Sequence, residues 1–224
     1  QDFRTWDSSE IQSRFVIRDK GVYIESFRLR VLEICELKKQ QAIEHPDEVL
    51  YNTGILDAYG KPVYNIIPTV VILDSLPQLV SSAIFNASAN DDTNNNMTAA
   101  NLAKQYKAML REIKPRLEEA NVILFIINHI YEDINTGFFP KAAKNNYLKQ
   151  GETVAGGMYP LYISNNLFRF TTSTKLTKDK EFGIDGYHVK CEFIKSRSNR
   201  SGRIVPLVYN QERGFDTVLS MYQM

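Results

Sequence analysis

The sequence predicts a mixed α/β fold, in which a parallel sheet with helices on both faces is extended by an antiparallel meander. Two unbroken apolar runs, at 70–73 and 122–127, are rich in valine and isoleucine, which is typical of parallel strands buried on both faces. A long helical pattern at 98–120 lies between them, so the three segments predict a strand, helix and strand crossover. The last third of the chain holds β-rich runs separated by turn signals, which indicates the meander.

The other elements follow from the spacing of apolar residues and from the prolines. Apolar residues recur every three or four positions in 24–43, which predicts an amphipathic helix. His45-Pro46 should end it, because a residue before proline disfavours helical torsions. The segment 50–68 contains glycines and prolines, and we expect it to be irregular. The strands of the meander are expected at 161–172, 187–194 and 203–209.

Composition limits the classes of protein to consider. A chain of 224 residues with 43% hydrophobic residues suits one large α/β domain. Its net charge of +1 means that nucleic-acid contacts would come from local basic patches. The two cysteines, Cys35 and Cys191, are far apart, which argues against a disulfide scaffold or a zinc module and favours a reducing compartment. No apolar run approaches the roughly 20 residues of a membrane span, so no membrane partner is expected.

Polar residues follow both buried runs at the same point. Asp74 and Ser75 come directly after the first run, and Asn128 and His129 after the second. In open α/β sheets ligands bind at the carboxyl ends of the strands, so we expect the chemistry along this edge. The alternative is that Asp74 caps the next turn and that His129 is simply a polar strand end.

Two polar segments are candidate DNA-binding loops, and both are expected to be poorly ordered without DNA. The first, at 86–97, is rich in asparagine but carries Asp91 and Asp92, which weakens its case. The second, at 130–157, ends in Gly156-Gly157. It mixes aromatic and basic residues, as single-stranded DNA sites do: Phe138, Phe139, Lys141, Lys144 and Lys149. The alternative is a solvated connector and an ordinary flexible insertion.

Four segments, in matching order and spacing, resemble those of the RecA recombinases, most closely the UvsX-type strand-exchange proteins of T-even phages. Residues 70–75 resemble the Walker B strand, and 125–129 resemble the strand that ends in Asn-Gln or Asn-His. Residues 153–157, followed by 161–164, resemble the stretch that closes the second DNA-binding loop. Lys195-Ser196-Arg197 resembles a basic pair that reaches the ATP of a neighbouring subunit. The resemblance covers nearly the whole chain.

The resemblance implies a RecA-like P-loop NTPase core over 1–224 that uses ATP and Mg²⁺. It implies a DNA-dependent ATPase that forms a filament on single-stranded DNA and exchanges strands in DNA recombination and repair. It also implies a cytoplasmic location, in a bacterial or phage-infected cell.

The same resemblance implies roles for individual residues. Asp74 would hold Mg²⁺, with Ser75 beside the nucleotide, and His129, supported by Asn128, would sense the γ-phosphate. The remaining implied contacts are Lys195 and Arg197 with a neighbour's ATP, Trp6 over the adenine, and Gly156 and Gly157 in the DNA-binding loop. The alternatives are a solvated basic edge for the two cations and a packing role for Trp6.

One departure from the family is large. None of the eleven glycines lies in a G-x-x-x-x-G-K-[ST] frame, the loop whose amides and lysine hold phosphates. We expect the first strand and the P-loop to precede Gln1, and these 224 residues alone to be inactive. The alternatives are a non-catalytic DNA-binding or filament-modulating paralogue that lacks the P-loop, and a replicative helicase with the same core.

Overall fold

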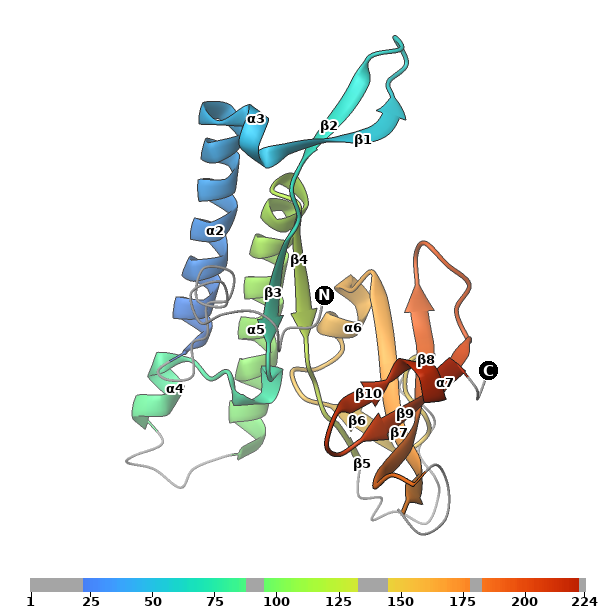
Figure 1. The fold of residues 1–224 in the computed structure, drawn as a ribbon. Coiled ribbons are helices and arrows are strands. Elements are labelled where there is room, and N and C mark those ends of the chain that lie inside the picture. Colours follow the sequence, from blue (N-terminus) through green and yellow to red (C-terminus); the bar gives the residue numbers. More distant parts are fainter. Residues whose placement is uncertain (1–21, 88–94, 133–144, 178–182, 222–224) are drawn as a thin grey trace. The chain divides into compact units, whose positions relative to one another are not determined.

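The structure, a computed structural model, describes residues 22–87, 95–132, 145–177 and 183–221 (Figure 1). The chain divides into two compact units. The first unit holds Gln1–Tyr131 and Val154–Gly157, and the second holds Glu132–Thr153 and Met158–Met224.

The first unit combines helices with small two-stranded sheets. Its helices are α2 (Ile24–Glu44), α3 (Pro46–Val49), the 3₁₀ helix η2 (Leu76–Gln78), α4 (Ser82–Ala87) and α5 (Asn95–Glu119). Its strands are β1 (Leu50–Leu56), β2 (Pro62–Ile66), β3 (Thr69–Leu73) and β4 (Val122–Ile126). The short strands β5 (Ile130–Glu132) and β6 (Glu152–Val154) lie where the chain passes between the two units.

The two long helices confirm the predictions for 24–43 and 98–120. Helices α2 and α5 pack against each other and lie side by side in Figure 1. Ion pairs join them at Arg28–Glu112 (2.6 Å) and Lys39–Glu119 (3.1 Å). The buried side chains recur at helical spacing, on α2 at Ile24, Phe27, Val31 and Cys35 and on α5 at Tyr106, Met109, Leu110 and Ile113.

Strands β3 and β4 confirm the predicted parallel crossover, but not their burial on both faces. They pair in parallel from Thr69 opposite Val122 to Leu73 opposite Ile126. Successive side chains of a strand point to opposite faces, and only one face of this ribbon is buried, with Leu73 and Val122 each 7% exposed. The prediction that helices also bury the second face of these strands is wrong for the described residues. Its apolar side chains are exposed: Val70, Ile72, Ile123 and Phe125.

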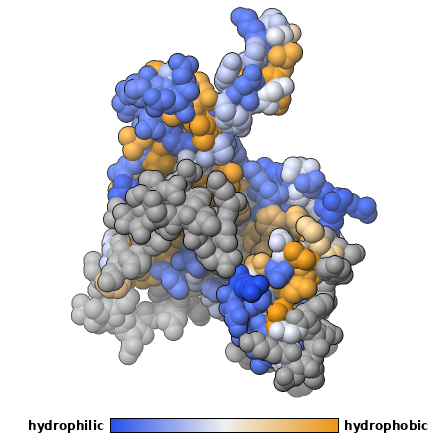
Figure 2. All heavy atoms as spheres, in the orientation of Figure 1, coloured by the Kyte–Doolittle hydropathy of each residue, from blue (hydrophilic) through white to orange (hydrophobic). Residues whose placement is uncertain are grey.

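The predicted irregular segment at 50–68 is instead an antiparallel hairpin of β1 and β2, which extends away from the helices of its unit (Figure 1). Its turn is built by Asp57, whose Oδ1 accepts hydrogen bonds from the amides of Tyr59 (2.8 Å) and Lys61 (2.9 Å). Both faces of the ribbon are largely exposed, with hydrophobic residues beside hydrophilic ones (Figure 2). The sequence therefore lacks the alternation that would have indicated these strands.

The second unit contains the predicted antiparallel meander, in the order β10-β9-β8-β7. Its elements are α6 (Tyr159–Ile163), β7 (Asn166–Leu176), β8 (Gly186–Ser196), β9 (Ile204–Asn210), β10 (Gly214–Asp216) and α7 (Thr217–Met221). Strand β7 begins at Asn166 rather than at residue 161, because α6 occupies the preceding residues. The predicted extension of the parallel sheet by the meander is wrong for the described residues, because the four strands form a sheet of their own.

Candidate functional site

The carboxyl ends of β3 and β4 bring the predicted site residues to one edge of the ribbon. Pairing continues past the strands, since the Ile127 amide donates to the Leu73 carbonyl (2.9 Å) and the Leu76 amide donates to the Ile127 carbonyl (2.9 Å). The parallel register therefore places Asp74 and Ser75 alongside the residues that follow β4. We call Asp74, Ser75, Asn128 and His129 the strand-end edge.

The two residues after β3 have opposite environments. Asp74 is exposed, so its carboxylate is open to solvent. Ser75 is 2% exposed, and its hydroxyl oxygen is buried with no hydrogen-bond partner among the described residues. The peptide bond between them is cis. The Asp74 carboxylate is thus open to solvent, whereas the Ser75 hydroxyl is buried in the interior of its unit.

The residues after β4 connect the strand-end edge to a later segment. The Asn128 side-chain amide donates to the Ala155 carbonyl (3.0 Å), and the His129 backbone amide donates to Asn128 Oδ1 (2.9 Å). The His129 side chain is exposed, and its ring centroid lies 6.4 Å from that of Tyr131. Asn128 therefore joins the end of β4 to the segment that closes the predicted second DNA-binding loop.

Gly156, in that closing segment, lies close against the Tyr106 ring. Gly156 has φ +77°, and a Cβ atom there would lie 2.8 Å from Tyr106 Cδ2. The buried Tyr106 hydroxyl lies within hydrogen-bonding distance of the carbonyls of Leu79 (2.7 Å) and Leu76 (3.0 Å), which share its single proton, and burial raises the pKa of this phenol. Tyr106 was not among the residues predicted to be functional. The sequence pattern indicates only that Tyr106 lies on the buried face of α5, and an aromatic residue there is usually a core residue.

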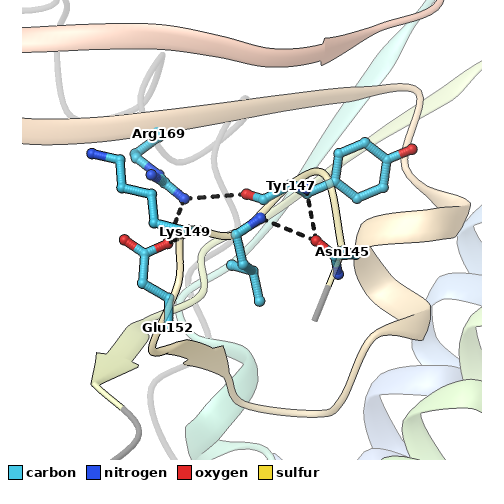
Figure 3. Close-up of polar contacts among 6 residues, drawn as sticks. Asn145, Tyr147, Lys149, Glu152 and Arg169 are labelled. Atoms are coloured by element: carbon cyan, nitrogen blue, oxygen red, sulfur yellow. Dashed lines mark hydrogen bonds and ion pairs between the residues drawn. The ribbon is translucent and has the colours of Figure 1, made fainter. Parts of the chain in front are cut away.

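A second group of predicted residues lies in the second unit, in a turn at 145–152 that we call the Lys149 turn. Figure 3 shows its polar contacts. Asn145 Oδ1 accepts from the amides of Tyr147 (2.7 Å) and Leu148 (3.0 Å). Glu152 Oε2 accepts from the Lys149 amide (2.7 Å) and from Arg169 Nη2 (2.8 Å). This part of the predicted poorly ordered loop is therefore a folded turn with an exposed lysine.

Several predicted residues lie outside the described ranges. From the second loop these are Phe138, Phe139, Lys141 and Lys144. Most of the first loop, residues 88–94, and the candidate adenine contact Trp6 also lie outside them.

Lys195 and Arg197 lie at the end of β8, in the second unit, whereas Asp74 belongs to the first. Lys195 Nζ donates to the carbonyls of Leu161 (3.0 Å) and Tyr162 (2.7 Å), near the end of α6. Burial, together with the nearby charge of Arg197, lowers the pKa of Lys195. Arg197 is exposed. To contact the ATP of a neighbouring copy, Lys195 would have to break its hydrogen bonds to these two carbonyls. Arg197 would not, because its side chain is open to solvent.

Asp74 is the residue at the strand-end edge that would hold a magnesium ion if a nucleotide carried one there. No three His, Cys, Asp or Glu side chains within the described ranges are grouped so as to hold a metal ion. Mg²⁺ bound with phosphates needs only one or two protein carboxylates, and Asp74 is one exposed carboxylate at the expected edge. For the phosphates themselves, the 224 residues offer no G-x-x-x-x-G-K-[ST] loop.

Comparisons with known proteins do not place the chain in a family. No protein-family model matches the sequence, and no curated protein matches it significantly. In the described part of the chain, no helix has the length and apolar character needed to cross a membrane.

Proposed function

We propose that the chain is the core of an ATP-dependent DNA strand-exchange protein of the RecA-like class, which forms a filament on single-stranded DNA. One observation carries the proposal. The parallel pairing of β3 with β4 sets Asp74 beside the residues after β4, and Asn128 among them bonds directly to Ala155. Asp74 and the closing segment 154–157 thus belong to one unit, and Asn128 links the end of β4 to that segment, which supports the proposal.

Each of the candidate site residues would have its own role in ATP hydrolysis. When bound, ATP with Mg²⁺ supplies the phosphoryl group whose transfer to water drives the cycle. Asp74 would orient the metal ion, as an exposed carboxylate at a strand end can. His129 would report the state of the nucleotide, because its backbone is bonded to Asn128. Arg197, and Lys195 once released from its carbonyls, would add positive charge to the site of a neighbouring copy.

A second candidate function is a non-catalytic, DNA-binding or filament-modulating paralogue. One observation favours it: the Lys195 ammonium is bonded within its own unit. Both candidates predict binding of single-stranded DNA. They differ in whether the protein releases phosphate.

Replacing Lys141, Lys144 and Lys149 together with alanine should weaken binding of the chain to single-stranded DNA and flatten its salt dependence. Each lost phosphate contact lowers the slope of log K against log salt by about 0.7 for single strands. A fluorescently labelled oligothymidine, titrated at several salt concentrations, measures both quantities.

The matched control replaces three exposed lysines outside the loop, Lys61, Lys104 and Lys175. It changes the net charge by the same amount and should leave the slope closer to that of the wild type. An affinity and slope equal to wild type in the loop variant would exclude these lysines as phosphate contacts.

A further inference from the structure

A buried ion pair lies beneath the Lys149 turn. Arg169, on β7, and Glu152 have side chains that are 6% and 19% exposed, and their charged groups lie 2.8 Å apart. The free energy lost by removing two charges from water is about as large as the free energy gained from their attraction. Such a pair therefore adds little to the net stability of the fold. The role of this pair is therefore to be sought in the backbone groups that it holds.

The pair holds two backbone groups of the Lys149 turn, the Tyr147 carbonyl and the Lys149 amide. Arg169 Nη2 donates to the Tyr147 carbonyl (3.1 Å) as well as to Glu152 Oε2. The same carboxylate oxygen accepts the Lys149 amide. Figure 3 shows the Arg169 guanidinium between the Tyr147 carbonyl and the Glu152 carboxylate.

The two ends of the turn differ in how they are held. The Tyr147 ring also contacts the Tyr162 ring, with 5.9 Å between centroids, and lies 5.2 Å from Lys195 Nζ. The Lys149 backbone is held through the Glu152 carboxylate, which Arg169 orients. Losing the pair should therefore release Lys149 more than Tyr147.

We propose that Arg169 and Glu152 are positioning residues, which hold Lys149 in the place where it contacts a phosphate of single-stranded DNA. This inference rests on the proposed function, and it adds two residues that do not themselves touch DNA. A lysine on a fixed backbone loses less conformational freedom on binding than one on a mobile loop, so the fixed turn favours the contact. Arginine suits the position because its planar guanidinium can hold a carboxylate and a carbonyl together, which a lysine ammonium does less well.

The test is a double-mutant cycle on binding to oligothymidine across a salt series. In the wild-type background, Lys149→Ala should weaken binding and lower the salt slope by about 0.7. In the background Arg169→Met/Glu152→Leu, which replaces the pair by apolar residues, Lys149→Ala should change neither quantity. The background alone should already show the weaker binding and the lower slope.

Stability and positioning are separated by two further measurements. Thermal unfolding shows whether the background variant is folded, and if it is not, Arg169→Lys takes its place, since it keeps the charge without the planar group. The matched control is Arg30→Met/Glu33→Leu, which removes an exposed ion pair on α2 (2.9 Å). In this control background Lys149→Ala should keep its full effect.

The outcomes separate this inference from the proposed function. An equal effect of Lys149→Ala with and without the buried pair would overturn the inference, as would no effect in the wild-type background. In both cases single-stranded DNA binding would persist and the proposed function would stand. If the wild-type chain did not bind single-stranded DNA at all, the proposed function itself would be overturned.

Discussion

Arg169→Met should lower the free energy of unfolding by about 3–5 kcal/mol, the usual effect of breaking a buried ion pair from one side. The variant leaves the Glu152 carboxylate largely buried without its cation. It also removes the donor to the Tyr147 carbonyl. Urea denaturation followed by circular dichroism measures the change.

Two comparisons show whether the loss comes from the unpaired charge. Arg169→Met/Glu152→Leu should recover most of the stability, because no charge is then left buried. Arg30→Met, which breaks an ion pair whose side chains are 61% and 59% exposed, should cost no more than about 1 kcal/mol. A loss for Arg169→Met as small as that for Arg30→Met would show that the buried pair does not fix the Lys149 turn.

Gly156→Ala should lower the free energy of unfolding by about 2–5 kcal/mol. A left-handed backbone costs a residue with a Cβ atom about 1–2 kcal/mol, and Gly156 has φ +77°. The new methyl group would also lie 2.8 Å from Tyr106 Cδ2 and 3.0 Å from Leu76 Cδ2. Overpacking of this kind costs about 1–3 kcal/mol more.

The matched control is Gly151→Ala, because Gly151 has the same φ of +77° and nothing within 4 Å of the added Cβ. Its cost should be the backbone contribution alone. Equal losses for the two variants would mean that Tyr106 does not hold the closing segment through Gly156. A larger loss for Gly156→Ala is expected from the same denaturation experiment.

The sequence was sufficient for elements whose pattern is local. Helix α2 follows from apolar residues at Ile24, Phe27 and Val31, and β3 and β4 from their valine and isoleucine runs. The strand-end edge could be predicted for the same reason. Once two strands are parallel neighbours, the polar residues that follow them lie at the same edge.

Features that depend on tertiary contacts could not be predicted. The hairpin of β1 and β2 is exposed on both faces, so its residues carry no alternation. The apolar run of β3 looked buried on both faces, yet Ile72 is 64% exposed. From the sequence, Arg169 looks like an ordinary polar residue in a strand. Its partner Glu152 lies 17 residues earlier, in a turn that only the folded chain brings close to it.

Phosphate release by the protein expressed from the complete reading frame, measured with and without single-stranded DNA, tests the proposed function most directly. Single-stranded DNA should stimulate the release, and Asp74→Asn should abolish it, because the exposed carboxylate that would orient Mg²⁺ is lost. The variant should still bind single-stranded DNA in the absence of ATP. A wild-type protein that binds single-stranded DNA but releases no phosphate would contradict the recombinase and favour the non-catalytic paralogue.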